Sequence, residues 1–214
     1  MRKPQEANLS WVVEFYSNYH SPSLQSIFVR RKQVPISEEA IQRVLQILPL
    51  ADGRDSYQEA LSHHCIYDLD WDAILRVIAE PGAFWTQGRM RPRPKCIHAR
   101  FLTVKARAWA QILSHYVLPS THESSVTMDL ALLVWCILTE RTVKIPLLIR
   151  QALGRVQDKG NLLFPALVFD LVTAASVPRE ANDTIAIISV KGNVVPTGKY
   201  LRPPMEPRNF AMAT

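Results

Sequence analysis

The chain has 214 residues, of which 48% are hydrophobic and 21% charged, and this composition excludes a largely disordered protein. Three cysteines, a small and odd number, argue against a secreted disulfide scaffold and favour an intracellular location, with cytoplasm and nucleus left open. The most apolar stretch, Leu130–Leu138, is shorter than the roughly 20 residues that cross a bilayer, and no signal peptide is visible. We therefore expect a soluble protein without membrane association.

The net charge of +6 is concentrated in one part of the chain. No acidic residue occurs between Glu80 and Glu123. The cations in this acid-free stretch are Arg89, Arg91, Arg93, Lys95, Arg100, Lys105 and Arg107. The rest of the chain is nearly neutral, so the basicity is local, as in proteins that contact a polyanion.

The N-terminal part predicts a helix followed by a small hairpin. Residues 1–8 are polar and are expected to be loose. Apolar residues at helical spacing predict a helix over residues 9–19, with Asn8 as its N-cap. Two β-branched runs around a charged turn predict a hairpin over residues 27–36.

Three further helices begin at residues that commonly cap helices. Ser37, Asp70 and Thr127 each precede an apolar segment with helical spacing. The helix after Thr127 contains the run 130–138, which is apolar on every side, and this pattern is typical of a buried central helix.

Residues 86–98 are predicted to form a basic loop, because Pro92 and Pro94 remove backbone donors. A long helix is predicted over residues 100–118. Its buried face is expected to contain Trp109, Ile112, Leu113, Tyr116 and Val117, with Arg100, Arg107, Gln111 and Ser114 on the other side.

Two more helices are predicted, one with Pro146 in its first turn and one from Pro165 to Pro178. Residues 185–195 could pair with each other as a hairpin turning at Gly192–Asn193, and the proline-rich end has no periodicity.

The predicted fold class is mainly α, as a single helical domain of about seven helices with a small N-terminal β-hairpin and a flexible C-terminal tail. The divisions are a loose N-terminus over 1–8, a helical domain over 9–178 and a tail or linker over 179–214. The expected core is led by Trp109, Leu132, Leu133, Trp135, Ile149, Leu153, Leu167 and Leu171.

Several local patterns between Leu9 and Pro178 resemble the plant transposon protein domain, which occurs in many plant genomes, often inside retroelement-like reading frames. The patterns are Val12–Tyr16, Phe28–Ser37 with Ile41, Gly82–Trp85, Ala106–Trp109, Leu118–His122 with Val126, Ala131–Leu138 and Leu163–Leu167. One departure is Arg31 at the hairpin turn, where this family often has Gly, and another is the density of Arg and Pro over residues 89–95. The resemblance implies transposon ancestry and a gag-like, capsid-like or nucleic-acid-associated role, and it implies no enzymatic activity.

Transposase or nuclease chemistry needs clustered carboxylates that hold two metal ions around the scissile phosphate. The candidates are Asp52, Asp55, Asp68, Asp70, Asp72, Asp129 and Asp170. Helix capping and the helix dipole explain most of them, so we expect no catalytic residue and treat a transposase or nuclease as the weakest hypothesis.

Other constellations also favour a structural interpretation. The sequence contains His63, His64 and Cys65, and separately Cys96 and His98, but no paired spacing typical of structural zinc. We expect no metal and no cofactor. There is no nucleophile elbow and no glycine-rich phosphate loop, so no small-molecule substrate is indicated.

The segment Pro119–Glu123 gathers hydroxyls, an imidazole and a carboxylate, although Ser120 and Glu123 match a capping box. His122 is the one polar residue in it that we would test for function.

The acid-free stretch supports the leading hypothesis, which is a non-enzymatic domain that binds RNA or DNA without sequence choice and self-associates. The predicted contacts to nucleic acid are Arg89, Arg91, Arg93, Lys95 and Arg107. Trp85 is a candidate for stacking on an unpaired base. The alternatives are a protein–protein interaction module and a basic loop that serves only solubility.

Overall fold

The computed structural model describes residues 5–21, 23–50, 53–62, 69–88, 91–118, 124–154, 161–188 and 194–196. The α-helices in these ranges are α1 (Leu9–Ser17), α2 (Glu38–Leu45), α3 (Ser56–Ser62), α4 (Trp71–Ile78), α5 (Val104–Tyr116), α6 (Met128–Leu138), α7 (Ile145–Gly154) and α8 (Pro165–Ala174). A 3₁₀ turn, η2 (Ala99–Phe101), precedes α5. The strands are β1 (Gln5–Asn8), β2 (Ser26–Val29), β3 (Lys32–Pro35), β4 (Thr86–Gly88), β5 (Arg91–His98), β6 (Ser125–Thr127), β7 (Asn161–Leu163), β8 (Ile185–Ile188) and β9 (Val194–Pro196).

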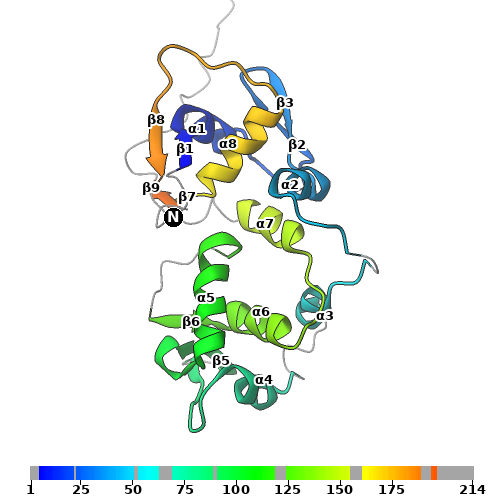
Figure 1. The fold of residues 1–214 in the computed structure, drawn as a ribbon, viewed down its shortest axis with the longest axis vertical. Coiled ribbons are helices and arrows are strands. Elements are labelled where there is room, and N and C mark those ends of the chain that lie inside the picture. Colours follow the sequence, from blue (N-terminus) through cyan, green and yellow to red (C-terminus); the bar gives the residue numbers. More distant parts are fainter. Residues whose placement is uncertain are drawn as a thin grey trace, which may run out of the picture.

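The elements form two groups that α7 joins (Figure 1). One group contains α1, α2 and α8 with the paired strands β1–β8, β2–β3 and β7–β9. The other contains α3, α4, α5 and α6 with the three-stranded sheet β4–β5–β6. Buried apolar residues from both groups belong to one continuous cluster. The described chain is therefore mainly α with small sheets, and it has a single core.

Helix α6 is the buried centre of the second group, as the sequence predicted. Its buried side chains are Leu130, Ala131, Leu132, Leu133, Val134 and Cys136. They lie on every side of the helix, because α6 packs against α3, α4, α5 and β5. Thr127 caps its N-terminus by accepting a hydrogen bond from the Leu130 N–H.

The other predicted caps and the N-terminal hairpin are also confirmed. Asn8, Ser37 and Asp70 each accept a hydrogen bond from a backbone N–H in the first turn of the helix that follows. Strands β2 and β3 pair as an antiparallel hairpin whose turn residues Arg30 and Arg31 both have positive φ, 47° and 63°. This left-handed geometry matches a type I′ hairpin turn, which explains why a glycine would suit the position of Arg31.

The predicted loose N-terminus and C-terminal hairpin were wrong where the structure describes them. Strand β1 pairs antiparallel with β8, and the Leu9 N–H donates to the Thr184 carbonyl at 2.8 Å, which extends the ladder. Strand β9 pairs with β7 rather than with β8. The apolar run of β8 finds its partner at the opposite end of the chain, and sequence periodicity carries no information about such pairing. Residues 1–4 and 197–214 lie outside the described residues.

The segment 86–98 was predicted to be a loop, and this was wrong as well. It forms β4 and β5, with β5 in the middle of its sheet. The prolines fit because β6 pairs only with Cys96, Ile97 and His98. Pro92 and Pro94 therefore lie where β5 has one neighbouring strand and the pairing with β4 shifts register.

Helix α5 turns a different face to the core than the sequence predicted. Its buried residues are Ala106, Ala110 and Leu113, with Val117 just after its end. Trp109, Ile112 and Tyr116 are 39%, 46% and 43% exposed. Small alanines let α5 pack closely against α6, so large side chains are placed beside the contact rather than in it. Of the eight residues that were expected to lead the core, Trp109 is exposed and Trp135 is partly buried, whereas the other six are buried.

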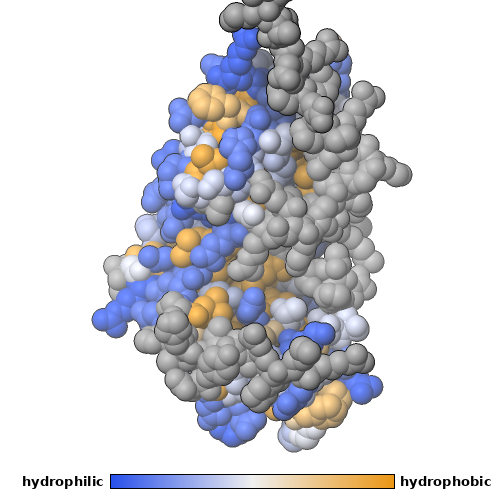
Figure 2. Space-filling model, turned by 180° about the vertical axis from the view of Figure 1, so that it is seen from behind, coloured by the Kyte–Doolittle hydropathy of each residue, from blue (hydrophilic) through white to orange (hydrophobic). Residues whose placement is uncertain are grey.

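None of the helices in the described ranges is both long and apolar enough to span a membrane. Figure 2 shows that the described residues on the rear face are mostly hydrophilic, with apolar residues in small separate areas.

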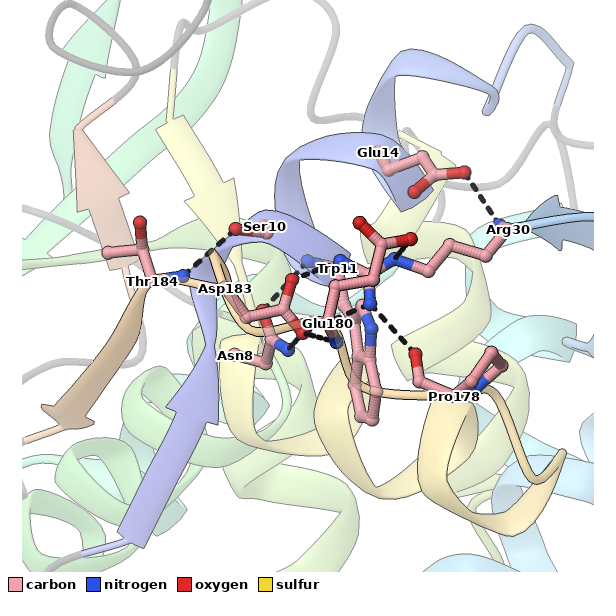
Figure 3. Close-up of polar contacts among 9 residues, drawn as sticks. All are labelled: Asn8, Ser10, Trp11, Glu14, Arg30, Pro178, Glu180, Asp183 and Thr184. Carbon is pink, nitrogen blue, oxygen red and sulfur yellow. Dashed lines mark hydrogen bonds and ion pairs between the residues drawn. The ribbon is translucent and has the colours of Figure 1, made fainter.

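The carboxylate of Asp183 joins three parts of the first group (Figure 3). It pairs with the Arg30 guanidinium at the hairpin turn, accepts from the Asn8 side-chain amide at 2.6 Å and accepts from the Glu180 N–H at 3.0 Å. The Asp183 side chain is only 4% exposed. The hydrogen bond from Arg30 lowers the pKa of the Asp183 carboxyl to about 2, with smaller contributions from the Glu180 N–H and from Asn8.

Arg30 has further contacts that hold its unusual backbone geometry in place. Its N–H donates to the Glu14 carboxylate at 2.6 Å, and its guanidinium donates to the Pro178 carbonyl at 2.8 Å. The guanidinium also lies 6.0 Å from the ring centroid of Trp11, which stacks on Phe169. The hairpin turn is therefore attached to α1 and to the segment that follows α8.

Asp183→Asn removes the charge that pairs with the nearly buried Arg30 guanidinium. We expect the free energy of unfolding to fall by about 3 kcal/mol at pH 7. Because the folded-state pKa is lowered, this contribution is present above about pH 4, the ordinary aspartate range, and is lost as pH falls toward 2. Urea unfolding of both proteins from pH 7 to pH 2.5 measures it. A stability difference that stayed constant over this range would contradict the assignment.

Candidate nucleic-acid interface

The described part of the acid-free stretch forms β4, β5, η2 and α5, and α5 runs from the side of β5 toward α7 (Figure 1). Ile97 is fully buried and anchors β5 in the core. Lys95 and His98, on either side of it, are exposed. The Thr103 hydroxyl caps α5 by accepting from the Ala106 N–H, and the helix then presents Lys105 and Arg107 to solvent.

The structure describes part of the predicted set of contact residues. Lys95 and Arg107 are both exposed. The backbones of Arg91 and Arg93 lie in β5, but their side chains are outside what the structure describes, as are Arg89 and His122. The chain at residues 91–98 is extended, as the hypothesis required, although the register shifts break the simple alternation of side chains.

Arg107 has a structural role that the sequence analysis did not identify. Its Nε donates to the Ala99 carbonyl at 3.1 Å, and its Nη2 donates to the carbonyls of Arg100 and Leu102 at 3.1 Å each. These bonds satisfy carbonyls at and just after η2 and hold a positive charge beside the turn. A phosphate there would contact a guanidinium whose position is already fixed.

The described cations of the stretch carry charge that no carboxylate neutralises. Lys95, Arg100, Lys105 and Arg107 are all exposed, and none forms an ion pair within the described ranges. Glu80 is an exposed glutamate attached to the same turn through its backbone, since its N–H donates to the Phe101 carbonyl at 2.8 Å. One exposed carboxylate leaves this surface with a net positive charge.

An aromatic cluster lies next to these cations. The rings of Phe84 and Phe101 are 5.3 Å apart between centroids, and Phe84 is 61% exposed. The Arg100 guanidinium lies 4.6 Å from the Phe101 centroid, and His98 meets the same ring edge-on at 6.4 Å. We call Phe84, His98, Arg100 and Phe101 the aromatic–basic cluster. Sequence reasoning missed it, because its members come from three separate turns and strands.

Trp85, the residue that the sequence suggested for base stacking, is half-buried instead. Its indole N–H donates to the Trp71 carbonyl at 3.2 Å, and its ring meets the Trp71 ring edge-on at 5.6 Å. Its neighbour Phe84 occupies the exposed position.

Two of the candidate carboxylates, those of Asp55 and Asp70, accept hydrogen bonds from backbone N–H groups at the start of a helix. Asp55 accepts hydrogen bonds from the Tyr57 and Gln58 N–H groups at the start of α3 and from the Lys144 N–H. Asp70 caps α4, and burial raises the pKa of Asp170. Within the described ranges no three His, Cys, Asp or Glu side chains are grouped so that they could hold a metal ion. Asp52, Asp68 and His63–Cys65 lie outside those ranges.

Cys136 lies in the buried helix α6. Burial raises the pKa of its thiol to about 11, so the group stays protonated at neutral pH and is a poor nucleophile.

A second exposed surface lies along α5. Trp109, Ile112 and Tyr116 are spaced three and four residues apart and therefore share one side of the helix. Their exposure gives α5 an apolar stripe next to its cations.

The fold described above is that of a mainly α domain with small sheets. A family model described as "Putative plant retrotransposon-related domain" matches residues 1–178. This match covers most of the chain, and the chain belongs to this family of plant retrotransposon-related domains. It confirms the retrotransposon ancestry that the sequence motifs implied. No curated protein and no solved structure matches the chain.

Arg107→Ala removes three hydrogen bonds to the carbonyls around η2. We expect the free energy of unfolding to fall by about 1–2 kcal/mol, since exposed hydrogen bonds of this kind have modest net worth. Lys105→Ala, on the same helix, is the matched control and is expected to change stability by less than about 0.5 kcal/mol. Urea unfolding measures both. Equal effects of the two substitutions would show that the bonds to these carbonyls do not stabilise the turn.

Proposed function

We propose that this domain is a non-enzymatic, gag-like domain of retrotransposon origin that binds RNA or DNA without sequence choice through the positive surface of the acid-free stretch, and that it acts inside the cell. The observation that carries the proposal is the set of four exposed cations, Lys95, Arg100, Lys105 and Arg107, without a carboxylate partner in the described residues. Such charges attract phosphates and release counterions on binding. Arg89, Arg91 and Arg93 belong to the proposal as sequence predictions.

The arrangement favours contacts to phosphates over reading of base edges. The described cations are distributed over β5, η2 and α5, instead of lying along one helix that could enter a major groove. Lysine and arginine side chains on separate elements contact the phosphate backbone of the nucleic acid. Such contacts carry no sequence information. We therefore expect similar affinity for unrelated sequences of equal length.

Lys95→Ser with Lys105→Ser removes two exposed cations of the proposed surface. Lys32→Ser with Arg43→Ser removes two exposed cations from the other group and keeps the net charge matched. Fluorescence anisotropy of labelled oligonucleotides over a series of salt concentrations measures binding. We expect the first variant to bind more weakly and to flatten the salt slope by about one unit for each phosphate that it no longer neutralises.

The control variant is expected to keep the parental slope. No binding by the parent at low salt, or equally weakened binding by both variants, would contradict the proposed surface. Metal-dependent cleavage of the probe would overturn the non-enzymatic part of the proposal.

A second candidate function is protein–protein contact through the apolar stripe of α5, including self-association. Trp109, Ile112 and Tyr116 provide a row of large apolar groups on one helix, which is typical of helix-mediated interfaces. Tryptophan and tyrosine are also enriched among residues that dominate interface energies.

Trp109→Ser with Tyr116→Ser removes the two aromatic side chains of the stripe. If copies of the chain associate through this face, the parent sediments as a concentration-dependent oligomer and the variant as a monomer. Sedimentation equilibrium at several concentrations measures this, with Phe28→Ser, another exposed aromatic, as the control. A parent that stays monomeric throughout would remove self-association and leave a different protein as the partner of this face.

A further inference from the structure

We infer that the aromatic–basic cluster holds unpaired bases, so that the preferred ligand of this domain is single-stranded rather than duplex nucleic acid. This inference rests on the proposed nucleic-acid binding and adds a ligand class to it. The cluster consists of Phe84 after α4, His98 at the end of β5, and Arg100 and Phe101 in η2.

Phe84 is placed where it contributes little to the core. It is 61% exposed, whereas most large apolar side chains of the second group belong to the buried cluster. The Phe101 ring supports it from one side at 5.3 Å, with an angle of 48° between the planes. A ring that is supported on one side and open to solvent on the other can stack on a base.

Guanidinium groups lie over and beside the turn that holds the Phe101 ring. The Arg100 guanidinium lies over the Phe101 ring at 4.6 Å, and His98 lies against the ring edge. Arg107 is bonded to the carbonyls of Ala99, Arg100 and Leu102, so its charge adjoins the same turn. Aromatic rings and cations lie together at this turn, and this combination is typical of proteins that bind single strands.

The chemistry of the cluster distinguishes single strands from duplexes. A phenylalanine ring has no group that could hydrogen-bond a base edge in a groove. It gains energy from nucleic acid by stacking on an exposed base face, and the bases of a duplex are already stacked on each other. Every base has such a face, so the contact tolerates any sequence and agrees with binding without sequence choice.

Glu80 allows the location of the proposed binding site to be tested. Its N–H donates to the Phe101 carbonyl, so this exposed glutamate is attached to the same turn as Arg100 and Phe101, where a negative charge disfavours phosphate. Glu80→Gln is therefore expected to tighten binding of single strands modestly, by about 2-fold or more at low salt. Glu39→Gln, an exposed glutamate at the start of α2, should change affinity by less than that.

The test is fluorescence anisotropy with labelled 12-nucleotide oligo(U) and oligo(dT) and with a 12-base-pair DNA duplex. The chain is used whole, as the parent and with Phe84→Ala, Phe84→Leu or Phe84→Trp. Phe28→Ala is the matched control, because Phe28 is 58% exposed but lies on β2 in the other group. Thermal unfolding of each variant verifies that it is folded.

We expect Phe84→Ala and Phe84→Leu to weaken binding of both single strands by about 5- to 100-fold, which is the range of one base–aromatic stack. Phe84→Trp is expected to keep or improve the affinity, and Phe28→Ala is expected to leave it unchanged. Duplex binding by the Phe84 variants should stay within about 2-fold of the parent, because phosphate contacts remain.

The outcomes separate this inference from the proposed function. Equal affinity of the parent for single strands and duplex, with no effect of Phe84→Ala, would overturn the inference and leave phosphate binding standing. Weakened binding in Phe84→Ala with full retention in Phe84→Leu would show plain apolar contact and would also overturn stacking. No binding of any probe by the parent would overturn the proposed function itself.

Discussion

The carboxylate of Asp183 is the point at which three distant segments of the chain meet. It receives hydrogen bonds from the hairpin turn through Arg30, from the end of β1 through Asn8 and from its own loop through Glu180 (Figure 3). A buried carboxylate is stable as an anion only when such partners surround it. These contacts attach the hairpin turn and the end of β1 to the segment that leads into β8, the strand that pairs with β1. The family model ends at residue 178, so Asp183 and Glu180 lie beyond the matched segment, whereas their partners Arg30 and Asn8 lie within it.

The second group of elements depends on a different constraint, the burial of α6. An apolar helix has to be covered on all sides, and α3, α4, α5 and β5 provide the cover. The residues that these elements bury are small or aliphatic, such as Ala106 and Ile97, and their charged residues therefore lie on the outer surface. The positive surface that we propose as the interface follows from this packing, because the sequence between Glu80 and Glu123 provides cations and no carboxylate.

Local signals in the sequence predicted the described helices other than α3 and several of their caps, because capping depends on a few neighbouring residues. Asn8, Ser37, Asp70 and Thr127 all cap helices as expected. The errors concern contacts between distant residues. The pairing of β1 with β8 spans the chain, and the prolines of β5 are tolerated only because β6 is short. The prediction of the buried face of α5 was wrong, because Ala106, Ala110 and Leu113 face the core and the larger Trp109 does not.

The candidate site was predictable in its charge but not in its aromatic part. A run of lysine and arginine without acidic residues can be read directly from the sequence. The contact between Phe84 and Phe101, by contrast, depends on how the end of α4 packs against η2. The sequence pointed to Trp85 for stacking, although Phe84 is adjacent to it and spacing alone does not show which of the two rings is exposed. The structure shows that Phe84 is the exposed ring, whereas the Trp85 indole is half-buried and donates to the Trp71 carbonyl.

The most direct test of the central claim, that nucleic acid binds to the positive surface of the acid-free stretch, is hydrogen–deuterium exchange of the whole chain with and without saturating oligo(U). We predict slower exchange on binding in peptides that contain residues 84–88 and 91–101, and no change in β2, β3 or α2. Protection confined to the first group of elements, with none in residues 84–101, would contradict this claim.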